Sequence, residues 1–165
     1  MSKLFYFAYG SNLHPTWLNS RVPSASPVSN ITLVNWKLYF HKRSDDNSAK
    51  CNIIKTDSDD DVIHGTIYEF NSDEKMELDK AEGGYTPETM KLDEFGDVLV
   101  YLANTERIEN DLPIYTWYHD IVLAGAEFHN LPNSYIEYIK AFKTINDPDT
   151  NRDKEKRLIV WPKKE

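Results

Sequence analysis

The strongest constraint in this 165-residue sequence is an aromatic run near the N-terminus that breaks abruptly at a glycine. Residues Lys3–Ala8 are mostly apolar, which predicts a strand buried on both faces. The strand leads into Tyr9–Leu13, where consecutive backbone N–H groups can face a ligand and Gly10 lets that ligand approach closely because it has no Cβ. Ser11 and Asn12 add short donors and acceptors. The alternative is a plain strand and turn, in which Gly and Asn supply left-handed backbone geometry.

The size and charge of the chain limit the kinds of partner it can have. A length of 165 residues predicts one domain, 1–165, in which residues 146–165 form a less certain C-terminal tail. The aromatic share of 13% suits a β-rich core and a pocket with aromatic walls. A net charge of -8 argues against nucleic acid or an anionic membrane as the main partner. No apolar run approaches the roughly 18 residues that a membrane-spanning helix needs.

Cysteine content indicates the compartment. Cys51 is the single cysteine of the sequence, so no intrachain disulfide forms, and this fits a reducing environment. It has no obvious base or resolving partner, which favours a buried structural thiol. The first residues, Met1–Lys3, lead directly into a strand pattern, and we expect no signal peptide. We therefore expect a cytoplasmic protein.

Alternating and periodic apolar residues predict a mixed order of strands and helices. The predicted strands are Lys3–Ala8, Ile31–Phe40, Cys51–Lys55, Val62–Phe70, Thr89–Leu92 and Val98–Ala103. The predicted helices are His14–Asn19, Asp73–Ala81, Trp117–His129 and Asn133–Ile145. The predicted irregular segments are Arg21–Ser29, His41–Lys50 and Asp111–Ile114. This order predicts an α+β fold.

Two charged segments are expected to be surface features. Asp57–Asp61 lacks the glycine and the distal glutamate of a calcium loop, so we expect a solvated turn across which Val62–Phe70 pairs back. Asn146–Lys156 is polar and charged, and it is the strongest candidate for mobility. Leu158–Trp161 is apolar enough to dock on the body of the protein.

Glu82 is the residue whose position is hardest to explain by stability alone. It ends the predicted helix Asp73–Ala81, just before Gly83 and Gly84. The C-terminal end of a helix carries the negative pole of its dipole, where a carboxylate is disfavoured. This placement and partial burial would raise the pKa of Glu82 and make it a better base near neutral pH. The alternative is an exposed acid that the helix end tolerates.

The histidines give no metal-ligand pattern. They are His14, His41, His64, His119 and His129, and their spacing matches no HExxH or similar motif. We therefore expect no metal site.

Three stretches together resemble the γ-glutamylcyclotransferase family. They are Phe7-Ala8-Tyr9-Gly10-Ser11-Asn12-Leu13, Leu78-Asp79-Lys80-Ala81-Glu82-Gly83, and Tyr118-His119-Asp120-Ile121-Val122-Leu123-Ala124-Gly125-Ala126 followed by Leu131-Pro132. Each stretch is weak alone, but the three occur in the family's order and at roughly its spacing, from Phe5 to about Asp147. The resemblance implies a small α+β domain built on a closed or nearly closed β-barrel with helices packed around it.

The resemblance also implies an activity. The α-amino group of a γ-glutamyl compound would attack its own γ-amide carbonyl and release 5-oxoproline and a free amino acid or amine. Glu82 matches the catalytic residue, which would act as general base and then general acid. The turn Tyr9–Leu13 and Tyr118 match positions that line the substrate pocket. No metal or other cofactor is implied, the partner is a small molecule, and a homodimer remains compatible with the resemblance.

One position departs from the family pattern. The family usually has a Tyr about seven positions beyond its catalytic Glu, and this chain has Thr89 there. Tyr85 replaces that tyrosine if the connection is shortened. Otherwise the pocket differs and the substrate preference changes.

Three functions follow as alternatives. The first is a γ-glutamyl cyclotransferase for γ-glutamyl amino acids or amines. The second is a non-catalytic relative that binds a γ-glutamyl metabolite or a protein. The third is a cyclotransferase for glutathione or another γ-glutamyl compound. Glu82 favours an enzyme, because a pocket that only binds a carboxylate-bearing ligand gains nothing from a nearby anion.

Overall fold

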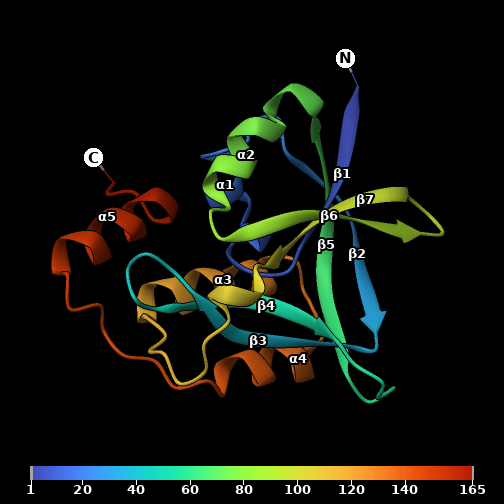
Figure 1. The fold of residues 1–165 in the computed structure, drawn as a ribbon. Helices are drawn as coiled ribbons and strands as arrows, with labels where there is room; N and C mark the ends of the chain where they lie inside the picture. Colours follow the sequence, from blue (N-terminus) through green and yellow to red (C-terminus); the bar gives the residue numbers. More distant parts are fainter. Residues whose placement is uncertain (1, 165) are drawn as a thin grey trace.

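A five-stranded sheet and a separate two-stranded ribbon form the framework, and helices pack around them (Figure 1). The computed structural model describes residues 2–164. The strands are β1 Lys3–Ala8, β2 Ser26–Val34, β3 Trp36–Arg43, β4 Ala49–Lys55, β5 Val62–Asn71, β6 Tyr85–Leu92 and β7 Gly96–Ala103. The α-helices are α1 Pro15–Asn19, α2 Lys75–Ala81, α3 Thr116–Phe128, α4 Asn133–Lys140 and α5 Thr150–Val160. Short 3₁₀ turns are η1 Ser11–Leu13, η2 Ser72–Glu74 and η3 Thr105–Arg107.

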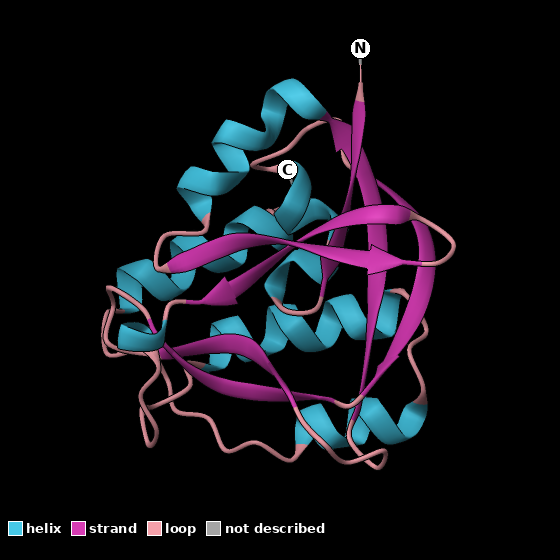
Figure 2. Cartoon of the chain, turned by 45° about the vertical axis from the view of Figure 1, so that its right-hand side comes forward, coloured by secondary structure: helices cyan, strands magenta, loops and turns pink. Residues whose placement is uncertain are grey.

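The α+β class predicted from the sequence is confirmed, but the sheet is not closed into a barrel. The strand order is β2-β5-β1-β7-β6, with β1 antiparallel to β5 and parallel to β7. Strands β2 and β6 are therefore the two edges of this sheet, and β3 pairs with β4 in the separate ribbon. In Figure 2 some strands of the sheet run upright at the right of the molecule and others cross its middle, and the two-stranded ribbon lies below them.

The predicted strand Ile31–Phe40 was wrong, because it is two strands that belong to different sheets. The break falls at Asn35, whose φ of 69° turns the backbone sharply. The N–H of Asn35 donates to the carbonyl of Asp61, and its carbonyl accepts from the N–H of Thr56. Apolar residues continue on both sides of this turn, so the sequence pattern alone does not reveal it.

The predicted pairing of Val62–Phe70 across the acidic turn was also wrong. Strand β5 lies between β1 and β2, whereas β4 pairs with β3. The predicted irregular segment His41–Lys50 is shorter than expected, because β3 extends to Arg43 and β4 begins at Ala49. Likewise, β2 begins at Ser26, inside the stretch predicted to be irregular.

The helices near the candidate site agree well with the sequence patterns. Helix α1 begins at Pro15, and the ring of His14 accepts from the N–H of Thr16. Helix α2 ends at Ala81, and Gly84 has the left-handed φ of 83° expected of a helix-ending glycine. Helix α4 is shorter than predicted and ends at Lys140.

Beyond α4 the chain runs back beside the start of α3. The N–H of Ile145 donates to the carbonyl of Ile114, and the carbonyl of Ile145 accepts from the N–H of Thr116. These bonds hold an extended segment where the sequence predicted further helix.

Helix α5 was not predicted. The side chain of Asp149 accepts from the N–H of Arg152 and caps its start. Arg157 pairs with Asp153 at 2.9 Å and with Asp120 of α3 at 2.8 Å. The helix packs against α1 and α3, largely through charged groups, so the apolar periodicity that predicts a helix is weak here.

Helix α3 packs directly on the turn that follows β1. A Cβ added to Gly125 would lie 2.6 Å from the backbone N of His14 and 2.7 Å from the Cβ of Leu13. Gly125 therefore lets α3 pack closely against the turn. Leu13 is fully buried, and its carbonyl accepts bonds from Tyr68 and His129. The turn is thus held between the sheet and α3.

Gly125→Ala should lower the free energy of unfolding by about 1–3 kcal/mol, because the new methyl group overlaps the backbone of the turn. Chemical denaturation measures this loss. Gly83→Ala is the matched control, since a Cβ at Gly83 meets no atom within 4 Å. Equal stability of the two variants would contradict the close packing of α3 on the turn.

Candidate active site

One cavity of about 360 Å³ lies where the β1 turn, the β3–β4 ribbon, the end of α2, the start of α3 and α5 converge. Predicted site residues that line it are Tyr9, Gly10, Ser11, Asn12, Glu82, Tyr85 and Tyr118. Leu13 does not line it, because its side chain lies in the core. Three stretches that are far apart in the sequence therefore meet at one cavity.

Glu82 is held at the wall of this cavity by Asn12. The Nδ2 of Asn12 donates to Oε1 of Glu82 at 2.6 Å and to the hydroxyl of Tyr6 at 2.9 Å. The Oδ1 of Asn12 accepts from the Arg21 guanidinium at 3.2 Å. Asn12 is 3% exposed, so the orientation of its amide is fixed by these partners.

The surroundings of Glu82 adjust its basicity. Burial raises the pKa of the Glu82 carboxyl above its ordinary value, while Arg21, the Asn12 amide and Lys42 oppose that rise without cancelling it. A carboxyl with a raised pKa and a hydrogen-bonded, fixed orientation is suited to accept and return a proton near neutral pH.

The turn after β1 offers backbone donors beside Glu82. The N–H groups of Gly10, Ser11 and Asn12 have no hydrogen-bond acceptor among residues 2–164. The turn is closed instead by the next two N–H groups, of Leu13 and His14, which donate to the carbonyls of Gly10 and Ser11. Three adjacent N–H groups of residues that line the cavity are thus unpaired in this part of the chain.

Gly10 also has a packing reason to be glycine. A Cβ at this position would lie 3.0 Å from the Cβ of Cys51 and 3.4 Å from the hydroxyl of Tyr118. Its φ of -117° does not require glycine. Because β4 and α3 lie so close to the turn, there is little room for a side chain at position 10, whether or not a ligand is bound.

The cavity side of β4 is fixed by two tyrosines. The hydroxyl of Tyr118 accepts from the N–H of Cys51 at 2.9 Å, and the hydroxyl of Tyr85 donates to the carbonyl of Cys51 at 2.6 Å. Cys51 is buried, and burial raises the pKa of its thiol to about 12, so it is not a reactive thiolate. Tyr9 in turn donates to the carbonyl of Tyr101 on β7.

Tyr85 lines the cavity, whereas Thr89 is exposed on β6 and does not line it. The Tyr85 hydroxyl donates to the Cys51 carbonyl at 2.6 Å. The Lys42 ammonium lies 4.7 Å from the centre of the Tyr85 ring and donates to the carbonyl of Gly83. Tyr85 therefore acts as a wall between Lys42 and β4.

Sequence reasoning missed the basic residues of the cavity. They are Arg21, Lys42, Lys50, Lys80, Arg152 and Lys156, against three acidic residues, Asp45, Asp46 and Glu82. A chain with a net charge of -8 thus gathers an excess of positive charge around its main cavity, which favours an anionic ligand. These residues come from separate elements and form no motif, so the sequence carries no signal that would have found them.

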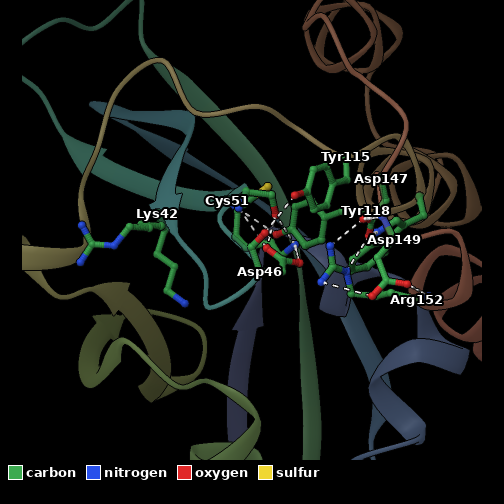
Figure 3. Close-up of polar contacts among 12 residues, drawn as sticks. Lys42, Asp46, Cys51, Tyr115, Tyr118, Asp147, Asp149 and Arg152 are labelled. Atoms are coloured by element: carbon green, nitrogen blue, oxygen red, sulfur yellow. Dashed lines mark hydrogen bonds and ion pairs between the residues drawn. The ribbon is translucent and has the colours of Figure 1, made fainter.

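Figure 3 shows how α5 is joined to this cavity. Arg152 makes two hydrogen bonds of 2.6 Å to Asp147, and Trp117 of α3 donates to the same carboxylate at 2.9 Å. Burial alone would raise the pKa of Asp147, but these bonds and that from the Asp149 N–H lower it to about 2. In this view Lys42 lies to the left of Cys51, whereas Asp147 and Arg152 lie to its right.

Within residues 2–164, no three His, Cys, Asp or Glu side chains are grouped so that they could hold a metal ion. None of the helices in this part of the chain has the length and apolar character needed to cross a membrane.

Residues 6–119 match the model of a protein family described as gamma-glutamyl cyclotransferase, AIG2-like. This match covers more than half of the chain and includes the β1 turn, Glu82 and Tyr118. The chain belongs to the gamma-glutamyl cyclotransferase, AIG2-like family. The family resemblance inferred from the three sequence stretches is thereby confirmed. No curated protein matches the sequence.

Solved structures share the fold of this family member. An uncharacterised protein from Homo sapiens is 26% identical with a TM-score of 0.73, and the match covers 88% of this chain and 90% of that one. A structure named gamma-glutamyl cyclotransferase is 24% identical with a TM-score of 0.76, covering 93% and 99% of the two chains. YkqA from Bacillus subtilis is 17% identical with a TM-score of 0.69, covering 88% and 57%. The last two show likeness of fold alone.

Arg21→Gln should raise the pKa of Glu82 further, because Arg21 is the strongest of the groups that hold this pKa down. The carboxyl carbon signal of Glu82, followed by NMR in the free protein, should titrate at higher pH in the variant. Lys80→Gln is the matched control, since Lys80 also lines the cavity but pairs with Glu77 at 3.0 Å. An unchanged or lowered titration point in Arg21→Gln would contradict the electrostatic coupling.

Tyr85→Phe should lower the free energy of unfolding by about 0.5–1.5 kcal/mol, because it removes the hydrogen bond to the Cys51 carbonyl. Denaturant titration measures the loss. The control is Tyr39→Phe, since the Tyr39 hydroxyl has no hydrogen-bond partner in the described chain, residues 2–164. If the Tyr85→Phe protein is as stable as the control, the hydrogen bond to the Cys51 carbonyl contributes nothing to the free energy of unfolding.

Proposed function

We propose that this protein is a γ-glutamyl cyclotransferase that converts γ-glutamyl compounds to 5-oxoproline and a free amine or amino acid, with Glu82 as general base and acid. The observation that carries the proposal is the Glu82 carboxyl, which has a raised pKa and is oriented by Asn12 at the wall of a basic cavity. Family membership and the adjacent unpaired N–H groups support it.

The first step needs a free amine. At neutral pH the α-amino group of the substrate is protonated, and an ammonium cannot act as a nucleophile. Glu82 takes one proton from it. The raised pKa of the Glu82 carboxyl makes this transfer easier, because it reduces the difference in pKa between the carboxyl and the substrate ammonium. The ammonium is attracted to this site because Glu82 has no basic side chain within ion-pair distance among residues 2–164.

Ring closure then requires a folded substrate. The amine nitrogen must reach the γ-carbonyl carbon of the same glutamyl chain, and a bound near-attack conformation supplies the needed proximity. Arg21 lines the cavity and has no acidic partner within 4 Å in residues 2–164, so it can hold the α-carboxylate. Its cation lies 4.5 Å from the centre of the Trp17 ring, which fixes its position.

The tetrahedral intermediate places a negative charge on the former γ-carbonyl oxygen. We assign the stabilisation of this charge to the unpaired N–H groups of Gly10, Ser11 and Asn12, whose residues line the cavity. The hydroxyl of Tyr118 accepts from Cys51 and keeps its own proton as a further donor at the cavity wall.

Collapse of the intermediate completes the balance. The bond between the γ-carbon and the leaving nitrogen breaks while Glu82 returns its proton to that nitrogen. The α-nitrogen still carries two protons after the attack, and it gives one of them to Glu82 as the lactam forms. Glu82 passes this second proton to the released amine, which leaves as an ammonium. The new bond between the α-nitrogen and the γ-carbon remains as the lactam of 5-oxoproline. One carboxyl therefore serves both steps, and no net proton is consumed by the protein.

A non-catalytic binding protein is the second candidate. Its cavity would hold the same ligand without turnover, but burying Glu82 beside a carboxylate-bearing ligand would then cost affinity. Incubation with a panel of γ-glutamyl amino acids, γ-glutamyl amines and glutathione, with detection of 5-oxoproline, separates the candidates and identifies the preferred substrate.

Glu82→Gln should fold normally and lose about 10²–10⁴-fold in turnover, because general acid–base catalysis is removed while Asn12 can still hydrogen-bond the side-chain amide oxygen. The release of 5-oxoproline measures turnover, and calorimetry measures retained ligand affinity. Glu77→Gln is the matched control, since Glu77 is an exposed acid on the same helix and does not line the cavity. Near wild-type turnover in Glu82→Gln would exclude Glu82 as the base.

A further inference from the structure

Lys42 is a buried cation of the cavity that has no carboxylate partner. It lies on β3, is 4% exposed and lines the cavity. Among residues 2–164, no carboxylate oxygen lies within 4 Å of its ammonium group. Lys50, the neighbouring lysine on β4, is instead paired with Asp46 at 3.1 Å. Burying an ammonium group without an ion pair costs stability, so packing alone does not explain Lys42.

A bulge in β3 turns Lys42 toward the cavity. The register between β3 and β4 shifts between Phe40 and Lys42, and this shift places Lys42 opposite Lys50. Residues that are paired across two strands share one face, and Lys50 also lines the cavity. Without the shift Lys42 would lie opposite Ala49, which does not line it. The bulge therefore brings a second positive charge to this wall, although two like charges repel across a strand pair.

The ammonium group of Lys42 is held by the turn that follows Glu82. Its Nζ donates to the carbonyl of Gly83 at 2.7 Å and lies 4.7 Å from the centre of the Tyr85 ring. Gly84 leaves room for it, because a Cβ there would lie 2.8 Å from Cε and 3.0 Å from Nζ of Lys42. Lys42 thus contacts each of the three residues after Glu82.

This contact completes the hydrogen bonding at the end of α2. The carbonyls of Glu82 and Gly84 accept from backbone N–H groups. The Gly83 carbonyl between them has no backbone donor among residues 2–164, and Lys42 supplies its donor. A cation at the C-terminal end of a helix also meets the negative pole of the helix dipole. Lys42 therefore fixes the backbone next to Glu82.

Lys42 lies near Glu82 but does not neutralise it. Because its ammonium is bound to the carbonyl of the next residue, it stays outside ion-pair distance of the Glu82 carboxylate. A positive charge at this separation favours the ionised carboxyl. Burial raises the pKa of Glu82, and Lys42 opposes this rise together with Arg21 and the Asn12 amide.

Other elements also place titratable groups around this pair. Burial lowers the pKa of Lys42, Arg107 of η3 adds to this change, and Glu82, Asp45 and Asp46 oppose it. The cations that act on Glu82 within residues 2–164 are Arg21 and Lys42. Burial raises the pKa of each tyrosine that faces Glu82, so these groups are neutral where Glu82 titrates; they are Tyr6, Tyr9, Tyr85, Tyr101 and Tyr118.

We propose that Lys42 is a positioning residue for the reaction, which holds the turn after Glu82 and stabilises the Glu82 carboxylate without pairing with it. This inference rests on the proposed function. The first step needs a carboxyl that is ionised, correctly oriented and free to accept a proton from the substrate. Lys42 supports the ionised form through its charge and the orientation through its hydrogen bond to Gly83.

The test begins with Lys42→Met, which removes the charge and the hydrogen bond but keeps a buried chain of similar length. The Glu82 carboxyl carbon signal of the free protein should titrate at higher pH than in the wild type. The acid limb of kcat/KM for γ-glutamyl-alanine should move to higher pH with it, and kcat near neutral pH should fall about tenfold or more. Lys42→Arg keeps the charge and should keep both titrations.

Lys37→Met is the matched control. Lys37 lies on the same strand, and its ammonium is 5.5 Å from the centre of the Tyr39 ring, but it does not line the cavity. Its removal should leave the titration of Glu82 and kcat unchanged.

The reverse variant tests the same coupling without altering Lys42. In Glu82→Gln the Cε signal of Lys42 should titrate at lower pH than in the wild type, because the carboxylate that raises the pKa of Lys42 is gone. Glu77→Gln should leave this signal unchanged, since Glu77 is exposed and pairs with Lys80.

Two results would overturn the proposal. One is a Lys42→Met protein whose Glu82 titration and kcat equal those of Lys37→Met, even if it is less stable, because Lys42 would then be purely structural. The other is a Lys42 titration that Glu82→Gln does not change, and this result decides the matter if Lys42→Met does not fold. If γ-glutamyl-alanine yields no 5-oxoproline with wild-type protein, the proposed function fails for this compound. The two NMR titrations then decide by themselves whether Lys42 stabilises the Glu82 carboxylate.

Discussion

The amide of Asn12 is the interaction on which the rest of the site depends. It donates to Glu82 and to Tyr6, and it accepts from Arg21. A single buried side chain thereby joins the turn after β1, the interior of the sheet and the end of α2. Because an amide has both donors and an acceptor, it can orient a carboxylate and a guanidinium at once without bringing them into a direct ion pair that would neutralise the base.

Packing around the turn gives this amide its rigidity. The backbone of α3 touches the turn at Gly125, and β4 touches it at Gly10 through Cys51. Both contacts need the absence of a side chain, so the same glycines that permit close packing also fix where the free N–H groups lie. The preorganisation of donors toward a developing negative charge follows from these backbone contacts, and it requires no flexible side chain.

The charge around the cavity is opposite in sign to the net charge of the protein. An acidic chain places six basic side chains around one hollow, and three of them, Lys50, Lys80 and Arg152, pair with carboxylates. Helix α5 contributes two of these, Arg152 and Lys156, although it lies beyond residues 6–119 that match the family model. The buried Asp147 holds this helix against the cavity through two hydrogen bonds from Arg152.

The sequence by itself determined the α+β class, the strand before Gly10, the helix that ends just before Glu82 and the family, because these depend on local periodicity and short motifs. Only the tertiary structure decided that the sheet stays open, that Ile31–Phe40 divides at Asn35 and that Asp147 anchors a polar helix. It also decided which cations surround Glu82. The physical reason is that paired strands and paired charges join residues that are far apart in the chain. The local sequence pattern does not predict which of these residues meet.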